Sequence, residues 1–158
     1  MKLKNIKISN YRCFKKAEID FDDHITLVVG KNGAGKTAIL DTIAVSVSTF
    51  LLGIDGGVSR SILKEDARYE FHNLNGTIDP QHQFPVIIET MGDCLNRSDI
   101  KWTRSLNSES GKTTVKDAGE LTGLAKKAQN QIMTGDKSLV LPLISYYGTG
   151  RLLSLIHI

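Results

Sequence analysis

Apolar positions near the start of the chain follow the alternating period of strands. Residues 3–8 and 17–21 form two short alternating runs, which predict strands on either side of a turn at Asn10 and Tyr11. A third apolar run, residues 25–29, predicts a further strand. The chain is therefore expected to begin with strands.

The spacing changes after residue 37, where apolar residues recur every three or four positions. This period predicts a helix that buries one stripe against a sheet and stops at Gly53, a residue that tolerates the left-handed conformation. The predicted stripe consists of Ile39, Ile43, Val47, Phe50 and Leu51.

The middle of the chain shows weaker patterns. Residues 85–91 and 100–106 alternate, and the polar connection at 92–98 completes the pattern of an antiparallel hairpin. Residues 60–74 are compatible with a short helix or with a strand and a loop. A loop rich in Ser, Gly and Lys is expected at 107–114.

Two more elements are predicted toward the end of the chain. Asp117 and Glu120 have the spacing of a capping box, and the apolar residues after them predict a helix that stops at Gly135. Residues 139–147 are almost continuously apolar, which favours a buried parallel strand. A turn at 148–151 follows it.

The sequence Gly-Lys-Asn-Gly-Ala-Gly-Lys-Thr, residues 30–37, lies between the third strand-like run and the first helix. It fits the phosphate-binding pattern G-x-x-x-x-G-K-[ST], whose glycines let backbone N–H groups face phosphate oxygens at a helix N-terminus. Lys36 is expected to reach the β- and γ-phosphates, and the Thr37 hydroxyl to ligate Mg²⁺. A glycine-rich turn without a ligand is the alternative, which the flanking strand and helix disfavour. The predicted nucleotide-binding residues are Gly30, Lys31, Asn32, Gly33, Ala34, Gly35, Lys36 and Thr37.

Residues 4–14, the strands after them, the loop G-x-N-G-x-G-K-T and residues 39–43 together resemble the start of an ABC-type ATPase head of the RecF/SMC/OLD group. Simple P-loop kinases and GTPases place the loop after their first strand, whereas extra strands come first here. Residues 141–151 are similar to a segment of bacterial AAA-15 and AAA-21 type ATPases, including Septu-like and retron-associated antiphage systems.

The resemblance implies an α/β fold of the P-loop NTPase class. It implies the N-terminal lobe of an ABC-type ATPase head, with an antiparallel β subdomain and a central mixed sheet flanked by helices. ATP and Mg²⁺ are the implied cofactors, and a second head is the implied homodimer partner. Arg12 resembles a family residue that approaches the nucleotide, with a surface arginine at a turn as the alternative. Adenine is expected to be accepted by stacking near Arg12 and Phe14, and Asp41 to form a packing or salt-bridge contact.

Two motifs of a complete ABC head do not occur in the sequence. One is an apolar strand ending in Asp-Glu, which supports Mg²⁺ and orients water, and the other is a Ser-Gly-Gly signature. Lys36 is therefore the expected catalytic residue, through phosphate stabilisation, and the general base is not in this chain. Residues 1–152 are expected to form an incomplete, inactive lobe, and residues 153–158 a non-native tail. The turn at 148–151 corresponds to a loop that senses Mg²⁺ and γ-phosphate in related heads, although a plain strand-ending turn fits equally well.

Charge is unevenly distributed along the chain, although the net charge is only +3. Residues 1–36 carry eight basic and four acidic side chains, whereas the remainder carries twelve and thirteen. The excess lies where a triphosphate must be held, with a DNA phosphate contact as a second interpretation. Cys13 and Cys94 lack metal-ligand spacing and are expected to be reduced thiols. Without a signal peptide or a run of about eighteen apolar residues, a cytoplasmic protein without membrane contact is expected.

The sequence leaves three classes of function open. The favoured class is ATP binding by half of an ATPase that, completed and dimerised, couples hydrolysis to DNA repair or processing, or to antiphage defence. Its partners would include DNA or a nuclease. A non-catalytic module whose contacts are switched by nucleotide is the second class. The third is a P-loop kinase or GTPase, although the guanine-reading Asn/Thr-Lys-x-Asp motif does not occur.

Overall fold

The centre of the computed structural model is a four-stranded antiparallel sheet. The structure describes residues 1–74, 77–136 and 138–148. The sheet has the order β2-β1-β5-β6, with strands β1 (Lys2–Tyr11), β2 (Phe14–Asp20), β5 (Val86–Cys94) and β6 (Arg97–Leu106).

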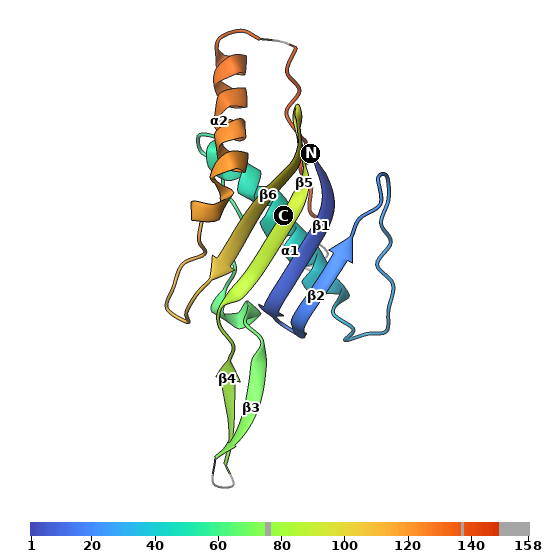
Figure 1. Cartoon of the computed structure of the whole chain (residues 1–158), viewed down its shortest axis with the longest axis vertical. Helices are drawn as coiled ribbons and strands as arrows, with labels where there is room; N and C mark the ends of the chain where they lie inside the picture. Colours follow the sequence, from blue (N-terminus) through green and yellow to red (C-terminus); the bar gives the residue numbers. More distant parts are fainter. Residues whose placement is uncertain (75–76, 137, 149–158) are drawn as a thin grey trace, which may run out of the picture.

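Two helices and a second hairpin surround this sheet. Figure 1 shows one helix crossing behind the sheet, the other beside its β6 edge, and a narrow hairpin that projects from one end. These elements are α1 (Lys36–Ser48), α2 (Gly119–Met133) and the hairpin of β3 (Tyr69–Leu74) and β4 (Thr77–His82).

The first two predicted strands and the predicted 85–106 hairpin are confirmed. Ile6 pairs with Ile19 on one side and Thr90 on the other, and Ile8 pairs with Ile88. Because side chains alternate across a strand, one face of these strands is apolar and buried. The cluster on that face includes Ile6, Ile8, Val86, Ile88 and Leu106, together with Ala38 and Val45 from α1.

Both apolar packing and buried polar contacts hold α1 on the sheet. Ser46 accepts hydrogen bonds from two strands, from Thr90 Oγ1 to its hydroxyl at 2.9 Å and from Trp102 Nε1 to its carbonyl at 3.1 Å. Arg104 Nη1 donates to Thr49 Oγ1 at 2.9 Å. Buried hydrogen bonds of this kind favour one docking position of the helix over its neighbours.

The predicted helix stops are correct in position, but one has a different cause. The first helix ends in a 3₁₀ turn, Thr49–Gly53. Gly53 does not adopt the left-handed conformation; instead, a Cβ atom there would lie 2.1 Å from the Thr122 carbonyl oxygen of α2. Gly53 therefore permits close approach of the two helical segments. Gly135, with a φ of 97°, ends α2 as predicted.

The predicted capping box at the start of α2 is wrong. A 3₁₀ turn, Lys116–Ala118, leads directly into α2, and no side chain caps either element. Asp117 lies inside the turn rather than at the helix N-cap, since the turn continues into the helix. The turn also carries Ala118, which is buried in the cluster shared with α2 and β6.

Two predicted strands, residues 25–29 and 139–147, are wrong. Both runs are described, but neither belongs to a strand. Ile25, Leu27 and Val29 are 82%, 80% and 81% exposed, and Leu143 is 96% exposed. A buried parallel strand needs a hydrogen-bonded neighbour on each side. The described residues supply none, so they do not form the expected central mixed sheet.

The projecting hairpin was not predicted from residues 60–74. Its strands pair from Tyr69 with His82 to Leu74 with Thr77. A proline at position 80 and several polar residues weaken the alternating pattern, because proline is depleted in strands. The Asn-Gly dipeptide at 75–76 is the sequence signal that favours a hairpin here.

Lys36–Gly53 is long and apolar enough, by length and composition, to cross a membrane. Half of its apolar window is buried inside the fold, which is typical of a helix at the centre of a protein. A buried helix that covers one face of a sheet, as α1 does, passes the same test of length and composition.

Candidate nucleotide-binding site

Residues 30–35 form a loop that leads directly into α1, whose first two residues are Lys36 and Thr37. Gly33 and Gly35 have φ values of 82° and 88°, which glycine adopts without the steric cost of a side chain. No side chain caps the first turn of α1. The first N–H groups of a helix have no partner within the helix, so those of α1 are available to an acceptor such as phosphate.

The turn between β1 and β2 packs against this loop. A Cβ atom at Gly35 would lie 2.6 Å from both Cys13 Sγ and Phe14 Cζ. The two extra strands at the start of the chain therefore place the β1–β2 turn against the phosphate loop. Together the two segments line an open pocket of about 480 Å³. Its lining consists of Arg12, Cys13, Asn32, Gly33, Gly35, Lys36, Thr37 and Ala38.

Lys36 points back across the loop. Its Nζ donates hydrogen bonds to the carbonyl oxygens of Gly30 at 2.7 Å and Lys31 at 2.8 Å. A phosphate oxygen is a stronger acceptor for an ammonium group than a carbonyl oxygen, because the bond is charge-assisted on both sides. Uncapped N–H groups, a lysine ammonium and the exposed Thr37 hydroxyl together fit Mg-triphosphate.

Arg12 is at the rim of the pocket, but it is also paired with carboxylates. Its Nη1 lies 2.6 Å from Asp41 Oδ2, and its Nη2 lies 2.8 Å from Asp66 Oδ1. Its side chain is 34% exposed. The backbone at Arg12 is left-handed, with φ at 48°, which a non-glycine residue adopts only at some cost. The bonds to Asp66 hold this turn in place.

The predicted salt-bridge role of Asp41 is confirmed. Its carboxylate, which is only 4% exposed, pairs with Arg12 and with Arg60 Nη2 at 2.9 Å. It also accepts a hydrogen bond of 2.5 Å from the Tyr146 hydroxyl. No sequence pattern predicts the roles of Asp66, Arg60 or Tyr146, because their contacts join segments far apart in the chain.

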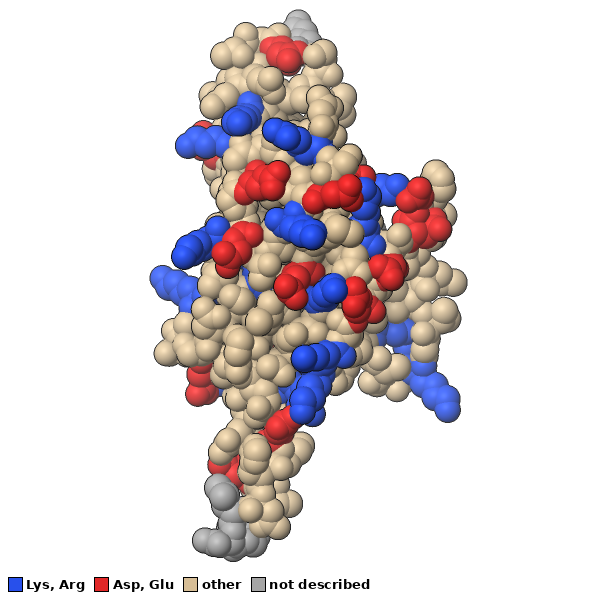
Figure 2. All heavy atoms as spheres, in the orientation of Figure 1, with Lys and Arg blue, Asp and Glu red and all other residues tan. Residues whose placement is uncertain are grey.

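The exposed face of the sheet carries both charges in close alternation, as Figure 2 shows. Lys4 lies 2.7 Å from Asp93 and 2.8 Å from Asp99, and Lys7 lies 3.1 Å from Glu18. These partners neutralise the N-terminal lysines. This face does not form the single-sign patch typical of DNA binding.

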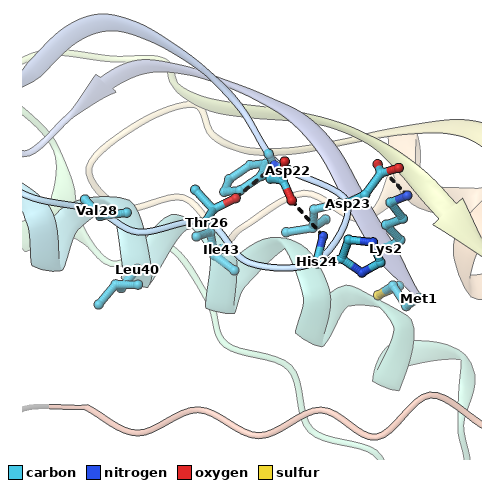
Figure 3. A pocket seen from close by; sticks show the side chains of 11 residues that line it. Met1, Lys2, Asp22, Asp23, His24, Thr26, Val28, Leu40 and Ile43 are labelled. Carbon is cyan, nitrogen blue, oxygen red and sulfur yellow. Dashed lines mark hydrogen bonds and ion pairs between the residues drawn. The ribbon is translucent and has the colours of Figure 1, made fainter.

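A second pocket separates α1 from the segment that precedes the loop. Figure 3 shows Thr26 and Val28 facing Leu40 and Ile43 across this space of about 390 Å³. Asp22 caps the local turn, accepting a hydrogen bond of 2.9 Å from the His24 N–H. The 25–29 run therefore lies over α1 with a hollow between them, rather than packed against it.

The cysteines are free thiols, as predicted, with Cys13 exposed and Cys94 buried. Burial raises the pKa of the Cys94 thiol. Among the described residues no group of three or more His, Cys, Asp or Glu side chains could hold a metal. Residues 149–151 of the predicted sensing turn and the predicted tail at 153–158 lie outside the described residues.

Comparison with curated proteins finds similarity to proteins named as DNA-repair and retron ATPases. It is 32% identical over 89 residues to the DNA replication and repair protein RecF of Clostridioides difficile, which covers 55% of this chain and 22% of that protein. It is 46% identical over 44 residues to the DNA double-strand break repair Rad50 ATPase of Archaeoglobus fulgidus, covering 28% and 5%. The retron Vc95 probable ATPase of Vibrio cholerae is 23% identical over 157 residues, covering 98% and 29%. The chain thus spans less than a third of the length of each.

A solved structure has the same fold. It comes from work on ATP-driven dimerization and DNA stimulated activation of SMC ATPases, and it matches with a TM-score of 0.53 at 16% identity. The match covers 100% of this chain and 92% of that one. These similarities confirm the P-loop NTPase fold and the predicted resemblance to the N-terminal region of RecF/SMC-type ATPase heads. The AAA domain family matches residues 5–156, and the chain therefore belongs to that family.

Proposed function

We propose that this chain binds Mg-ATP through residues 30–37. The observation that carries the proposal is the pocket itself, where the left-handed glycines, the uncapped start of α1 and the Lys36 ammonium converge. A fixed concave array of N–H donors and a cation recognises a polyphosphate by charge and by geometry.

Each loop residue has a distinct part in the proposed site. Backbone N–H groups of residues 30–37 would hold the β-phosphate, Lys36 would neutralise the β- and γ-phosphates, and the Thr37 hydroxyl would ligate Mg²⁺. The bound metal would offset negative charge between those phosphates. Arg12 at the pocket rim would add a further cation, and Phe14 would offer a surface for the base.

The activity of the longer protein is a wider proposal. We infer that residues 1–152 are the N-terminal lobe of a cytoplasmic ATPase that hydrolyses ATP when a second lobe and a second head complete the site. The RecF, Rad50 and SMC relatives support coupling to DNA repair or DNA processing. The retron relative, which matches 98% of the chain, supports antiphage defence. A module that only switches contacts with nucleotide remains the second candidate, since the chain lacks a water-orienting acid after an apolar strand.

Calorimetric titration of the full chain with Mg-ATP tests the binding proposal. Lys36→Ala should weaken binding about 10- to 150-fold, because a lost charge-assisted contact is worth roughly 1.5–3 kcal/mol. Lys127→Ala, which removes an exposed lysine from α2, is the matched control and should bind like the wild type. Equal affinity of the wild type and Lys36→Ala would contradict the site.

Competition between ATP and GTP separates the functional classes. Without a guanine-reading motif, the base should be accepted by stacking and shape, so the two nucleotides should compete within about tenfold of each other. A strong preference for GTP would favour the GTPase class and count against the proposed ATPase.

A further inference from the structure

Asp41 is a junction between three segments that are distant in the sequence. Its carboxylate receives Arg12 from the β1–β2 turn, Arg60 from the loop after α1, and the Tyr146 hydroxyl from residues 138–148. The residue itself belongs to α1, one turn after Thr37. A carboxylate that is 4% exposed requires such partners, since an unpaired buried charge is strongly unfavourable.

Arg12 is restrained on two sides at the edge of the phosphate pocket. Its Nε and Nη2 bond to Asp66 Oδ1 at 2.9 and 2.8 Å, while its Nη1 bonds to Asp41 at 2.6 Å. A guanidinium has five N–H donors in a fixed plane, so these three contacts determine its orientation and leave other N–H groups for a ligand.

The cluster also connects to the end of the described chain. The Arg60 guanidinium carbon lies 5.2 Å from the centre of the Tyr146 ring, in addition to its ion pair with Asp41. Two arginines and two carboxylates balance in charge, so moving Arg12 toward a phosphate leaves a net negative cluster. Beside this cluster, the Tyr11 hydroxyl is buried and has no hydrogen-bond partner among the described residues. Burial, and after it the charge of Asp66, raises the pKa of Tyr11.

We infer that Asp41 is a positioning residue, which holds the Arg12 guanidinium at the phosphate pocket and links the occupancy of that pocket to residues 138–148 through Tyr146. The inference rests on the proposed nucleotide site. Asp41 lies outside the G-x-x-x-x-G-K-[ST] pattern, and its negative charge alone would oppose the binding of an anionic nucleotide. The inference nevertheless gives this buried carboxylate a part in nucleotide binding.

The direction in which Asp41→Asn changes the affinity for Mg-ATP distinguishes a positioning role of Asp41 from a purely electrostatic one. If Asp41 acted only through its negative charge, Asp41→Asn would tighten binding of the anionic nucleotide. If Asp41 is a positioning residue, Asp41→Asn should instead weaken Mg-ATP binding about tenfold, and Arg12→Gln should do the same. The double variant should also lose about tenfold rather than a hundredfold, because both changes remove the same contact. Asp93→Asn, which removes a carboxylate from the far face of the sheet, should leave the affinity unchanged.

Tyr146→Phe tests the link while retaining both charged residues. In the wild type, Mg-ATP should change the amide hydrogen exchange of residues 138–148, and in Tyr146→Phe this response should be lost although ATP still binds. If Asp41→Asn does not fold, Tyr146→Phe still tests whether the pocket is linked to residues 138–148. Tighter binding by Asp41→Asn, additive losses in the double variant, or an unchanged exchange response in Tyr146→Phe would overturn the inference and leave the proposed function intact. No ATP binding by the wild type would overturn both.

Discussion

Gly35 illustrates how much of the proposed site depends on single atoms. Its left-handed backbone turns the chain from the loop into α1, and its lack of a side chain admits the β1–β2 turn. The glycines of the G-x-x-x-x-G-K-[ST] pattern are usually explained by backbone freedom alone. At this position a second requirement is equally strict, because Cys13 and Phe14 occupy the space of a Cβ atom.

Gly35→Ala should therefore weaken both folding and nucleotide binding. We expect a loss of about 1–3 kcal/mol in the free energy of unfolding, since overpacking and an unfavourable φ act together. Urea denaturation followed by circular dichroism measures it. Gly33→Ala is the informative control, because it shares the positive φ but has open space around it, so its loss should be smaller.

Asp93 provides a residue-scale prediction for acid stability. The Lys4 ammonium, and then the Asp99 N–H, lower the pKa of Asp93 below its usual value of 3.8. A carboxylate with a lowered pKa in the folded state contributes stability above its unfolded pKa and loses it as the pH falls. The thermal midpoint of Asp93→Asn should thus fall less steeply than that of the wild type below about pH 4. In a Lys4→Met background the substitution should have a smaller effect.

At the scale of elements, polar side chains determine where α1 sits on the sheet. Apolar packing alone tolerates sliding along a helix, whereas Ser46, Thr90 and Trp102 meet in a buried hydrogen-bonded group that one position satisfies. This docking sets the start of α1, and so the phosphate loop, relative to the β1–β2 turn. The sheet therefore positions the loop indirectly, through bonds that lie far from it.

Trp102→Phe should test this docking. The substitution removes the indole donor to the Ser46 carbonyl, which keeps the Thr49 N–H, and creates a space beside α1. The two effects together should cost about 2–4 kcal/mol in the free energy of unfolding. Chemical denaturation gives the value. Lys101→Ala, an exposed neighbour on the same strand, should change stability by no more than about 0.5 kcal/mol. A similar loss in both variants would contradict the role assigned to the indole N–H.

At the scale of the whole molecule, sequence patterns succeeded where contacts are local. Hairpin alternation predicted β1, β2, β5 and β6, and helical spacing predicted α1 and α2, because each pattern reflects a face buried within the described chain. The strand predictions for 25–29 and 139–147 failed because a strand requires paired neighbours, and the described residues provide none for these two runs. The Asp41 cluster could not be predicted at all, because no local pattern encodes contacts between segments that are distant along the chain.

The full chain should bind ATP without hydrolysing it at a meaningful rate. Phosphoryl transfer also requires a group that orients water and charge from a facing subunit. A phosphate-release assay checks this expectation, and the exposed apolar runs should make the protein prone to aggregation during purification. Robust hydrolysis that Thr37→Ala abolishes, without any added second half, would show that a complete active site is present.

The run at 25–29 is continuous with the first residue of the phosphate loop, and this continuity has a thermodynamic consequence. The loop joins α1 at one end, and its other end joins a segment that is separated from α1 by a hollow. A strand that paired with that segment would also order the loop. Because linkage is reciprocal, ATP must then strengthen the pairing of that strand by the same factor by which the strand strengthens the binding of ATP. The affinity for ATP would thus increase when a strand pairs with residues 25–29.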